Sequence, residues 1–247
     1  MNELKGKVVI ITGGASGIGL STVEAFLAKG SKVVLSDYDV EEGEKQTERL
    51  KDKGEVVFIQ ADVSKEEDVK SLIEQTAEKF GSVDVLFNNA GVLSQSKTHE
   101  LSYEEYSNII KINQDGVFFG SKYGVQQMLK NNGGVIINCA SILGSVGEPT
   151  AFAYNASKGA VVLMTKSLAL QYGKDNIRCA AVGPAYTESG MVNKEALGAE
   201  YYDALVDKHP IGRLGQPEEI AHAVVFIAEN QFVTGTTIFV DGGYTSQ

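Results

Sequence analysis

Short apolar runs rich in β-branched residues alternate with amphipathic stretches along the whole 247-residue chain. A short apolar run predicts a buried strand, and a longer amphipathic stretch predicts a helix. Regular alternation of the two is typical of a parallel sheet wrapped by helices, and right-handed crossovers make that sheet doubly wound. No Pro/Ser-rich linker divides the chain. We therefore expect an α/β, Rossmann-type fold in a single domain over 1–247.

Seven segments have the composition of buried strands: 7–12, 32–36, 55–60, 83–88, 134–140, 177–182 and 236–240. Six segments have helical character: 17–29, 40–53, 65–80, 102–130, 152–172 and 217–229. The stretch from 189 to 213 shows no strand pattern and is long for a connection. We interpret it as a mobile flap over the substrate.

A glycine-rich turn, TGGASGIG over residues 12–19, joins the first expected strand to the first helix. Gly13 allows a tight turn, Gly17 allows a pyrophosphate to approach backbone N–H groups, and Gly19 allows the helix to lie close to the sheet. Ser16 and Ile18 would supply backbone or hydroxyl contacts to the phosphates. Although a glycine-rich turn alone is a weak signal, its place between a strand and a helix predicts a dinucleotide site.

Asp37 ends the second expected strand, eighteen residues after Gly19. A carboxylate at this distance can hydrogen-bond the adenosine ribose hydroxyls, and its charge repels a 2′-phosphate. No lysine or arginine occurs in the glycine-rich turn, and none follows Asp37 until Lys45. The sequence therefore favours NAD over NADP. The alternative is that Asp37 only caps a turn.

Tyr154 and Lys158 lie four residues apart at the start of the helix expected over 152–172. Residues i and i+4 share a helix face, so the phenol and the ammonium point into the same space. A free tyrosine ionises near pH 10, and a fixed ammonium brings the phenolate closer to the range useful for general acid–base catalysis. Ser141, in the turn after a strand, could hydrogen-bond a substrate oxygen. Taken alone, the Tyr–Lys pair favours the interpretation as ordinary helix decoration, because such spacings recur by chance.

The serine, the tyrosine thirteen positions later, the lysine and the glycine-rich turn together form the pattern of the short-chain dehydrogenase/reductase family. The chain resembles this family over essentially its whole length. The segments GVFFG (116–120), AYNASKGAV (153–161) and VDGGYTSQ (240–247) resemble the family's R-specific secondary alcohol dehydrogenases of lactic acid bacteria, whose better-known members prefer NADP. The resemblance implies the strand order 3-2-1-4-5-6-7 and a 222-symmetric homotetramer.

The resemblance also implies catalytic roles. Tyr154 would transfer the hydroxyl proton, Lys158 would support it and bind the nicotinamide ribose, and Ser141 would hold the substrate oxygen. Asn113, amid the apolar residues of the helix over 102–130, would hold a water that links the lysine to solvent. From the residues alone, Asn113 is equally a buried amide that is satisfied by a carbonyl or a water.

Further cofactor contacts follow from the resemblance. Asp62 and Val63 would border the adenine, although Asp62 or Ser64 could also cap the next helix. The other implied contacts follow the fourth and sixth strands: Asn89, Ala90, Gly91, Pro184, Thr187 and Ser189. Ala185 stands where the family usually has glycine, which puts in doubt any backbone angle that favours glycine. Ser189 stands where threonine is usual and keeps the hydroxyl.

Composition narrows the partners and the location. The net charge of −10 and the pI near 4.9 argue against nucleic acid and anionic membranes. The polar N-terminus does not resemble a signal peptide, and Cys139 and Cys179 are interpreted as packed thiols, so we expect a cytoplasmic protein. No histidine has metal-ligand spacing. The resemblance alone places a structural Mg²⁺ at Gln247.

These observations predict an NAD-dependent oxidoreductase that interconverts a secondary alcohol and a ketone by hydride transfer, an alcohol dehydrogenase or ketoreductase. A 3-oxoacyl-carrier-protein reductase is an alternative. It fits less well, because that reaction usually uses NADPH and a carrier protein is acidic like this chain. A dinucleotide-binding sensor without chemistry is a second alternative. It would be expected to lose the tyrosine or the lysine, and both are present.

Overall fold

A computed structural model describes residues 4–189 and 192–246. Their strands form one seven-stranded sheet in the order β3-β2-β1-β4-β5-β6-β7, and each neighbouring pair is parallel. This confirms the predicted fold class and strand order. The strands are β1 (Val8–Thr12), β2 (Lys32–Asp37), β3 (Val56–Gln60), β4 (Val85–Asn88), β5 (Gly134–Cys139), β6 (Ile177–Pro184) and β7 (Thr237–Val240).

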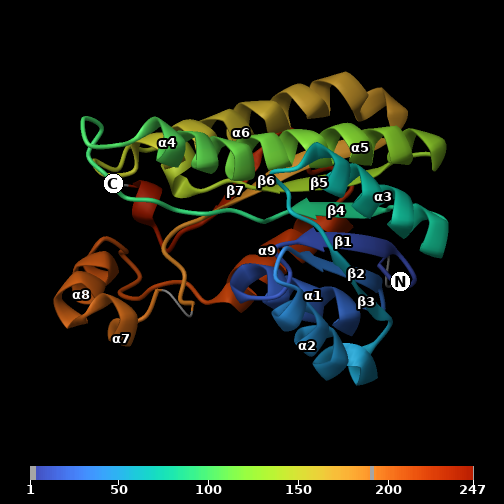
Figure 1. The fold of residues 1–247 in the computed structure, drawn as a ribbon, viewed down its shortest axis with the longest axis horizontal. Coiled ribbons are helices and arrows are strands. Elements are labelled where there is room, and N and C mark those ends of the chain that lie inside the picture. Colours follow the sequence, from blue (N-terminus) through green and yellow to red (C-terminus); the bar gives the residue numbers. More distant parts are fainter. Residues whose placement is uncertain (1–3, 190–191, 247) are drawn as a thin grey trace.

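Helices cover both faces of the sheet (Figure 1). In that view α3, α4, α5 and α6 lie above it and α1, α2 and α9 lie below it, while α7 and α8 project from one end. The helices are α1 (Gly17–Ala28), α2 (Val40–Leu50), α3 (Glu66–Phe80), α4 (Tyr103–Ile110), α5 (Gly116–Lys130), α6 (Phe152–Tyr172), α7 (Lys194–Leu197), α8 (Ala199–Asp207) and α9 (Pro217–Glu229).

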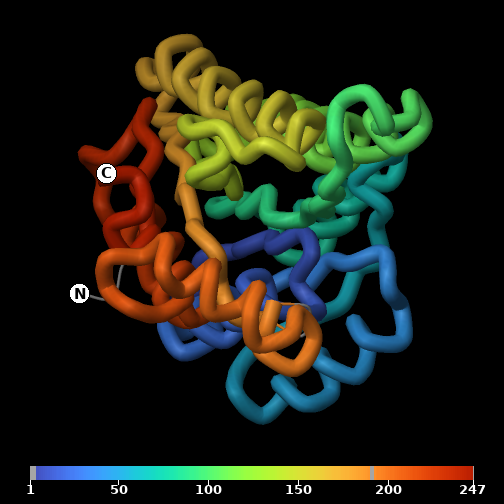
Figure 2. The backbone as a smooth tube through the Cα atoms, turned by 90° about the vertical axis from the view of Figure 1, so that its left-hand side faces the viewer, coloured from blue at the N-terminus to red at the C-terminus, as the bar shows by residue number. Residues whose placement is uncertain are grey.

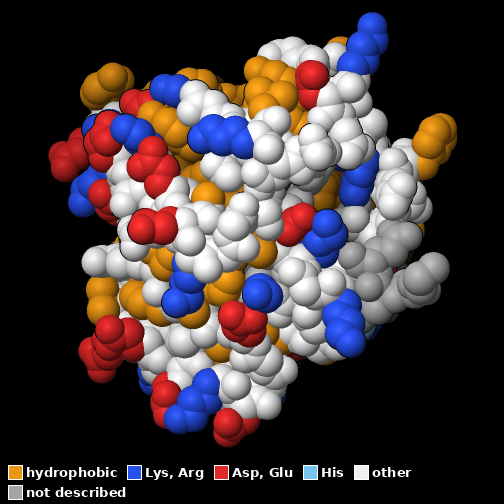
Figure 3. Space-filling view, turned by 90° about the vertical axis from the view of Figure 1, so that its right-hand side faces the viewer, with side chains coloured by type: hydrophobic (Ala, Val, Ile, Leu, Met, Phe, Trp, Pro, Cys, Tyr) orange, Lys and Arg blue, Asp and Glu red, His pale blue; other side chains and the backbone are white. Residues whose placement is uncertain are grey.

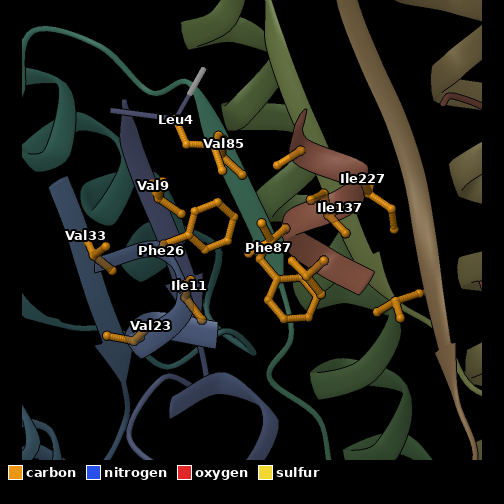
Figure 4. Close-up of a cluster of buried hydrophobic side chains, with 14 of the residues drawn as sticks. Leu4, Val9, Ile11, Val23, Phe26, Val33, Val85, Phe87, Ile137 and Ile227 are labelled. Atoms are coloured by element: carbon orange, nitrogen blue, oxygen red, sulfur yellow. The ribbon is translucent and has the colours of Figure 1, made fainter. Parts of the chain in front are cut away.

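The strand side chains divide the core into two layers, because successive residues of a strand point to opposite faces. Val9 and Ile11 of β1 pack with Phe26 of α1 on the lower face, where Figure 4 shows them with Phe87. Ile10, between them in sequence, packs on the upper face with residues of α3 and α5. Both faces are therefore apolar, which explains why these strands read as continuous apolar runs.

The helix expected over 102–130 is interrupted, which corrects the prediction. A π-helical turn, Lys111–Asp115, separates α4 from α5. Asn113 lies in this turn and is fully buried, and its amide bonds the backbone of Val92 in the loop after β4. Such turns are often found at functional sites. The sequence hides this one because apolar residues continue on both sides of it.

The stretch 189–213, interpreted from the sequence as a mobile flap without strands, carries α7 and α8 in its described part. Asn193 caps α7 by accepting the backbone N–H groups of Glu195 and Ala196. An isolated parallel bridge between Thr187 and Gly215 closes the base of the stretch. The prediction of an insertion without strands therefore holds for the residues described, and its mobility stays a prediction.

The end of the molecule opposite α7 and α8 carries acidic and basic side chains side by side (Figure 3). This face therefore presents no field of a single sign. None of the helices formed by residues 4–189 and 192–246 has the length and apolar character that a membrane crossing requires. Cys139 and Cys179 are both unpaired and buried, as expected, and burial raises the pKa of the Cys179 thiol to about 12.

Candidate active site

A cavity of about 200 Å³ opens where the strands end, at the end of the sheet from which α7 and α8 project. Figure 2 looks onto this end, with the orange segment after β6 crossing in front of the sheet. Ligands of parallel α/β sheets bind outside the carboxyl ends of the strands. The cavity is lined by Ile18, Leu93, Cys139, Ala140, Ser141, Ile142, Leu143, Tyr154, Pro184, Ala185, Tyr186, Thr187 and Val192.

The glycine-rich turn lies against the start of α1 and the end of β4. Gly13 has a left-handed φ of 62°, which glycine adopts at little cost. A Cβ on Gly19 would lie 1.9 Å from the carbonyl oxygen of Gly13, so any side chain there would push α1 away from the turn. A Cβ on Gly17 would meet nothing within 4 Å, so the chain is open to a ligand at this residue.

The N-terminus of α1 is suited to an anion. Ser16 is its N-cap residue, makes no side-chain cap hydrogen bond and is exposed, and the first turn holds no acidic residue. By contrast, α2 begins with Asp39 as a side-chain cap, followed by Glu41 and Glu42. The backbone N–H groups and the positive end of the helix dipole of α1 are therefore available to phosphates.

Thr12 joins the glycine-rich turn to the segment after β4. Its hydroxyl oxygen accepts the backbone N–H groups of Asn89 and Ala90, at 3.0 and 3.1 Å. The Asn89 side chain donates to the carbonyl oxygens of Thr12 and Gly13. These bonds hold the glycine-rich turn and the segment after β4 side by side. The sequence analysis missed Thr12, although a threonine just before the first glycine of the turn is a visible signal.

Asp37 is buried beside the glycine-rich turn. One carboxylate oxygen accepts the N–H of Ala15 at 3.1 Å, and the other accepts the N–H of Asp39 at 3.2 Å. The residue therefore does stabilise turns, as the alternative interpretation stated. Each oxygen has a second lone pair, so the carboxylate can also accept ribose hydroxyls.

Neither Asp62 nor Ser64, in the segment after β3, caps α3, although the sequence suggested that one of them could. Asp62 accepts the backbone N–H and the hydroxyl of Ser64, while the N-cap residue of α3 is Lys65, whose side chain makes no cap bond. A cap by Asp62 or Ser64 was therefore wrong. Burial alone would raise the pKa of Asp62, but the Ser64 bonds and the Lys65 ammonium hold it below its usual value. Val63 packs beside Gly116 of α5.

Tyr154 and Lys158 lie on the first turns of α6, and Tyr154 lines the cavity. Lys158 is only 3% exposed, and its ammonium lies 5.6 Å from the centre of the Tyr154 ring. It donates to the backbone carbonyl of Cys139 at 2.6 Å. No carboxylate of residues 4–189 or 192–246 forms an ion pair with Lys158. Since an ammonium has three donors and one is used by Cys139, Lys158 has donors left for a ligand beside the tyrosine.

Ser141 follows the end of β5 and lines the same cavity. Its hydroxyl oxygen accepts the backbone N–H of Leu143 at 3.1 Å, where the chain begins a short 3₁₀ turn. The hydroxyl proton therefore remains free to be donated to a ligand oxygen. The structure thus brings Ser141 and Tyr154 to one cavity, with Lys158 next to the tyrosine.

Asn113 lies behind this group. Its carbonyl oxygen accepts the N–H of Val92, and its two N–H donors bond the Val92 carbonyl and the Ser157 hydroxyl. The amide is satisfied by protein groups, as one alternative interpretation stated, and the water relay stays a prediction. A Cβ on Gly91 would lie 3.2 Å from the Asn113 oxygen and 3.6 Å from the Lys158 ammonium, so a side chain there would press on the Asn113 amide.

The segment after β6 supplies the front of the cavity. Pro184, Tyr186 and Thr187 line it. Ala185 has no left-handed φ, so the backbone at this position does not require the glycine that the family usually has there. The Ser189 hydroxyl accepts the N–H of Val192.

Leu143 and Tyr186 line the cavity, whereas Ala151 packs with Leu143 and is not among the lining residues. Met191 and Gln247 lie outside the described residues. The sequence analysis missed the apolar walls Leu93, Ile142 and Val192 because their loops gave no periodic signal.

The chain is similar in sequence and structure to known proteins. A family model described as "Enoyl-(Acyl carrier protein) reductase" matches residues 13–245. The NADP-dependent (R)-specific alcohol dehydrogenase of Lentilactobacillus kefiri is 41% identical, over 100% of this chain and 99% of the relative. The chain belongs to the short-chain dehydrogenase/reductase family.

Other members of the short-chain dehydrogenase/reductase family are similar over comparable lengths. The cyclohexanol dehydrogenase of Acinetobacter sp. (strain SE19) is 38% identical, over 100% of this chain and 98% of its own. The crystal structure of gox2181 superposes with a TM-score of 0.95 at 31% identity, covering 100% of this chain and 99% of that one. The chain is thus an oxidoreductase of this family with alcohol dehydrogenases among its relatives.

Proposed function

We propose that this short-chain dehydrogenase/reductase uses NAD to interconvert a small secondary alcohol and a ketone. The observation that carries the proposal is the buried Lys158 ammonium beside Tyr154, at a cavity that Ser141 also lines. Among the relatives, two names specify an alcohol dehydrogenase and a cyclohexanol dehydrogenase. Both kinds of evidence favour the same reaction.

In the direction of ketone reduction, the Ser141 hydroxyl donates a hydrogen bond to the substrate oxygen and fixes its position, while keeping its own proton. Tyr154 gives its proton to that oxygen as charge develops on it. The Lys158 ammonium stabilises the phenolate that remains. Bound nicotinamide cofactor supplies the hydride, and the apolar cavity walls exclude water from the reacting carbon. In alcohol oxidation the same groups act in reverse.

Several residues would hold the cofactor. Its phosphates fit the uncapped N-terminus of α1 around Ser16 and Gly17, and its adenosine ribose fits Asp37. The donors of Lys158 that do not bond Cys139 can reach the nicotinamide ribose. Ile18, Pro184 and Thr187, which line the cavity, are further proposed contacts. The remaining proposed contacts are Gly13, Gly19, Asp62, Val63, Asn89, Ala90, Gly91 and Ser189.

The test of this function is the absorbance of the nicotinamide, followed with a panel of small ketones and secondary alcohols and with NAD(H) and NADP(H) supplied separately. We expect turnover with NAD(H). Turnover only with NADP(H), the cofactor in the name of the Lentilactobacillus kefiri relative, would overturn the NAD part and leave the reaction standing. Absence of turnover with every compound of the panel would count against the reaction itself.

Replacing Asp37 by serine is expected to shift kcat/KM from NADH towards NADPH by at least about tenfold, or ~1.4 kcal/mol. The change removes both the acceptor for ribose hydroxyls and the charge that repels a 2′-phosphate. Asp39→Ser is the control, since it removes a nearby charge while serine can still cap α2. An equal shift in both variants would mean that general charge, rather than the Asp37 contact, sets the preference.

A homotetramer is part of the proposal. Large apolar side chains are exposed on α6, where Leu170 is 88% exposed and Leu163 65%, and near the edge strand β7, where Phe232 is 98% exposed. Two separate apolar faces fit an assembly with two kinds of contact. Light scattering should therefore give four times the 26.4 kDa chain mass. Leu170→Glu should halve that mass, and a monomeric wild type would overturn the assembly.

A 3-oxoacyl-carrier-protein reductase is the alternative enzyme, and the description of the matching family model names a carrier-protein substrate. Faster reduction of 3-oxoacyl thioesters than of free ketones would favour it.

A cytoplasmic location agrees with two unpaired cysteines. Within residues 4–189 and 192–246 no group of three or more His, Cys, Asp or Glu could hold a metal ion, and Mg²⁺ at Gln247 stays an expectation.

A further inference from the structure

A chain of buried polar side chains crosses the upper face of the sheet, beneath the cavity. Asn88 of β4 donates to the side-chain oxygen of Asn138 on β5, its register partner, at 2.9 Å. Asn138 in turn donates to the Thr165 hydroxyl of α6 at 2.9 Å and to the sulfur of Cys179 on β6 at 3.6 Å. These hydrogen bonds therefore link β4, β5, β6 and α6 through side chains alone.

Asn138 and Thr165 have fixed donor and acceptor roles in this series of hydrogen bonds. The Thr165 hydroxyl donates to the carbonyl of Val161 at 2.8 Å, which turns its lone pairs toward Asn138. Asn138 and Thr165 are both 0% exposed, and both N–H donors of Asn138 are used. Water cannot replace a lost partner at such a depth, so a displaced α6 would leave a buried donor unpaired. The bond thus favours a single placement of α6 on β5.

This placement matters because the same two elements carry the catalytic candidates. Cys139, the residue after Asn138, provides the carbonyl that holds Lys158. Thr165 lies seven residues after Lys158, about two helical turns away on the same buried face. Ser141 follows β5 as well. The Asn138–Thr165 bond therefore joins β5 and α6, the two elements that carry the proposed catalytic residues.

We propose that Asn138 and Thr165 are positioning residues that set α6 against β5, so that Tyr154, with Lys158 beside it, meets the substrate oxygen held by Ser141. The proposal rests on the proposed function. Neither residue lines the cavity, so each acts through the elements that it joins. Asn88 connects the same unit to the strand that leads into Asn89, Ala90 and Gly91.

The test compares three threonine variants. Thr165→Val keeps the shape and removes the hydroxyl, and Thr165→Ser keeps the hydroxyl. Thr76→Val is the matched control, because Thr76 is equally buried and bonds a carbonyl one turn back on α3, that of Leu72. We expect Thr165→Val to lower kcat about tenfold or more with the ketone KM within about twofold. Thr165→Ser and Thr76→Val should stay near wild type.

A second readout does not depend on turnover. Amide hydrogen exchange of the unliganded protein should rise over 152–160 in Thr165→Val and remain unchanged there in Thr165→Ser and Thr76→Val. Unchanged kcat and unchanged exchange in Thr165→Val would overturn the proposal, as would an equal loss of kcat in Thr76→Val. If the wild type reduces no ketone, the exchange data still decide, so the two proposals fail separately. Thr165→Ala carries the same test if Thr165→Val does not fold.

Discussion

Replacing Tyr154 by phenylalanine is expected to remove nearly all ketone reduction while NADH still binds. The change deletes one oxygen atom and keeps the ring that lies beside the Lys158 ammonium. Without that hydroxyl, no proton donor is aligned with the substrate oxygen, and such donors contribute roughly 10²–10⁴-fold to a rate. We therefore expect kcat to fall about 10³-fold at neutral pH, measured by NADH absorbance at saturating ketone and cofactor.

Tyr172→Phe is the control for this variant. Tyr172 ends the same helix and packs against the core of the upper face, far along α6 from the cavity. It should keep wild-type kcat, and NADH fluorescence titration should give similar affinities for both variants. A Tyr154→Phe enzyme that retains a tenth or more of wild-type kcat would show that another group donates the proton.

Replacing Arg178 by methionine is expected to give the largest loss of stability among single surface-accessible changes. Arg178 lies on β6, and its guanidinium donates to three backbone carbonyls, those of Ile227, Ala228 and Val233. Ile227 and Ala228 lie in the last turn of α9, whose final carbonyls have no partner within the helix. Hydrogen bonds from a charged donor are worth about 1.5–3 kcal/mol each, before solvent screening.

Because the guanidinium is only partly buried, we expect a loss of roughly 2–4 kcal/mol. For a chain of this size that corresponds to a melting temperature lower by about 5–12 °C. Circular dichroism at matched protein concentration measures it. Arg213→Met is the control, since its pair with Glu219 is exposed and should cost less than about 1 kcal/mol. Equal losses in the two variants would mean that the carbonyls near the end of α9 do not need Arg178.

The sequence predicts the layered fold well because its signals are local. Buried strands such as β1 are continuous apolar runs, and strand ends are marked by Gly13, Asp37 and Asn88. The pair Tyr154 and Lys158 is readable because helix geometry alone places residues four apart on one face. The order of the strands has no such local signal, and it was predicted from the family resemblance rather than from the residues.

The parts that could not be predicted depend on contacts between distant segments. The π turn around Asn113 is stabilised by Val92, twenty-one residues earlier, and no local pattern encodes that pairing. The bond from Asn138 to Thr165 joins a strand to a helix in the same way. The cavity walls Leu93 and Val192 belong to loops, whose course depends on the packing around them.

Two residues of the proposed catalytic group, Lys158 and Asn113, are both anchored by peptide groups. Lys158 is held by the carbonyl of Cys139, and Asn113 is held by the N–H and carbonyl of Val92. A main-chain atom is present whatever amino acid occupies the position. Substitutions at 139 or 92 therefore leave the anchoring atoms in place, and neither position need co-vary with the residue it holds. A deep mutational scan would mark Lys158 and Asn113 as intolerant while showing nothing at the partners that fix them.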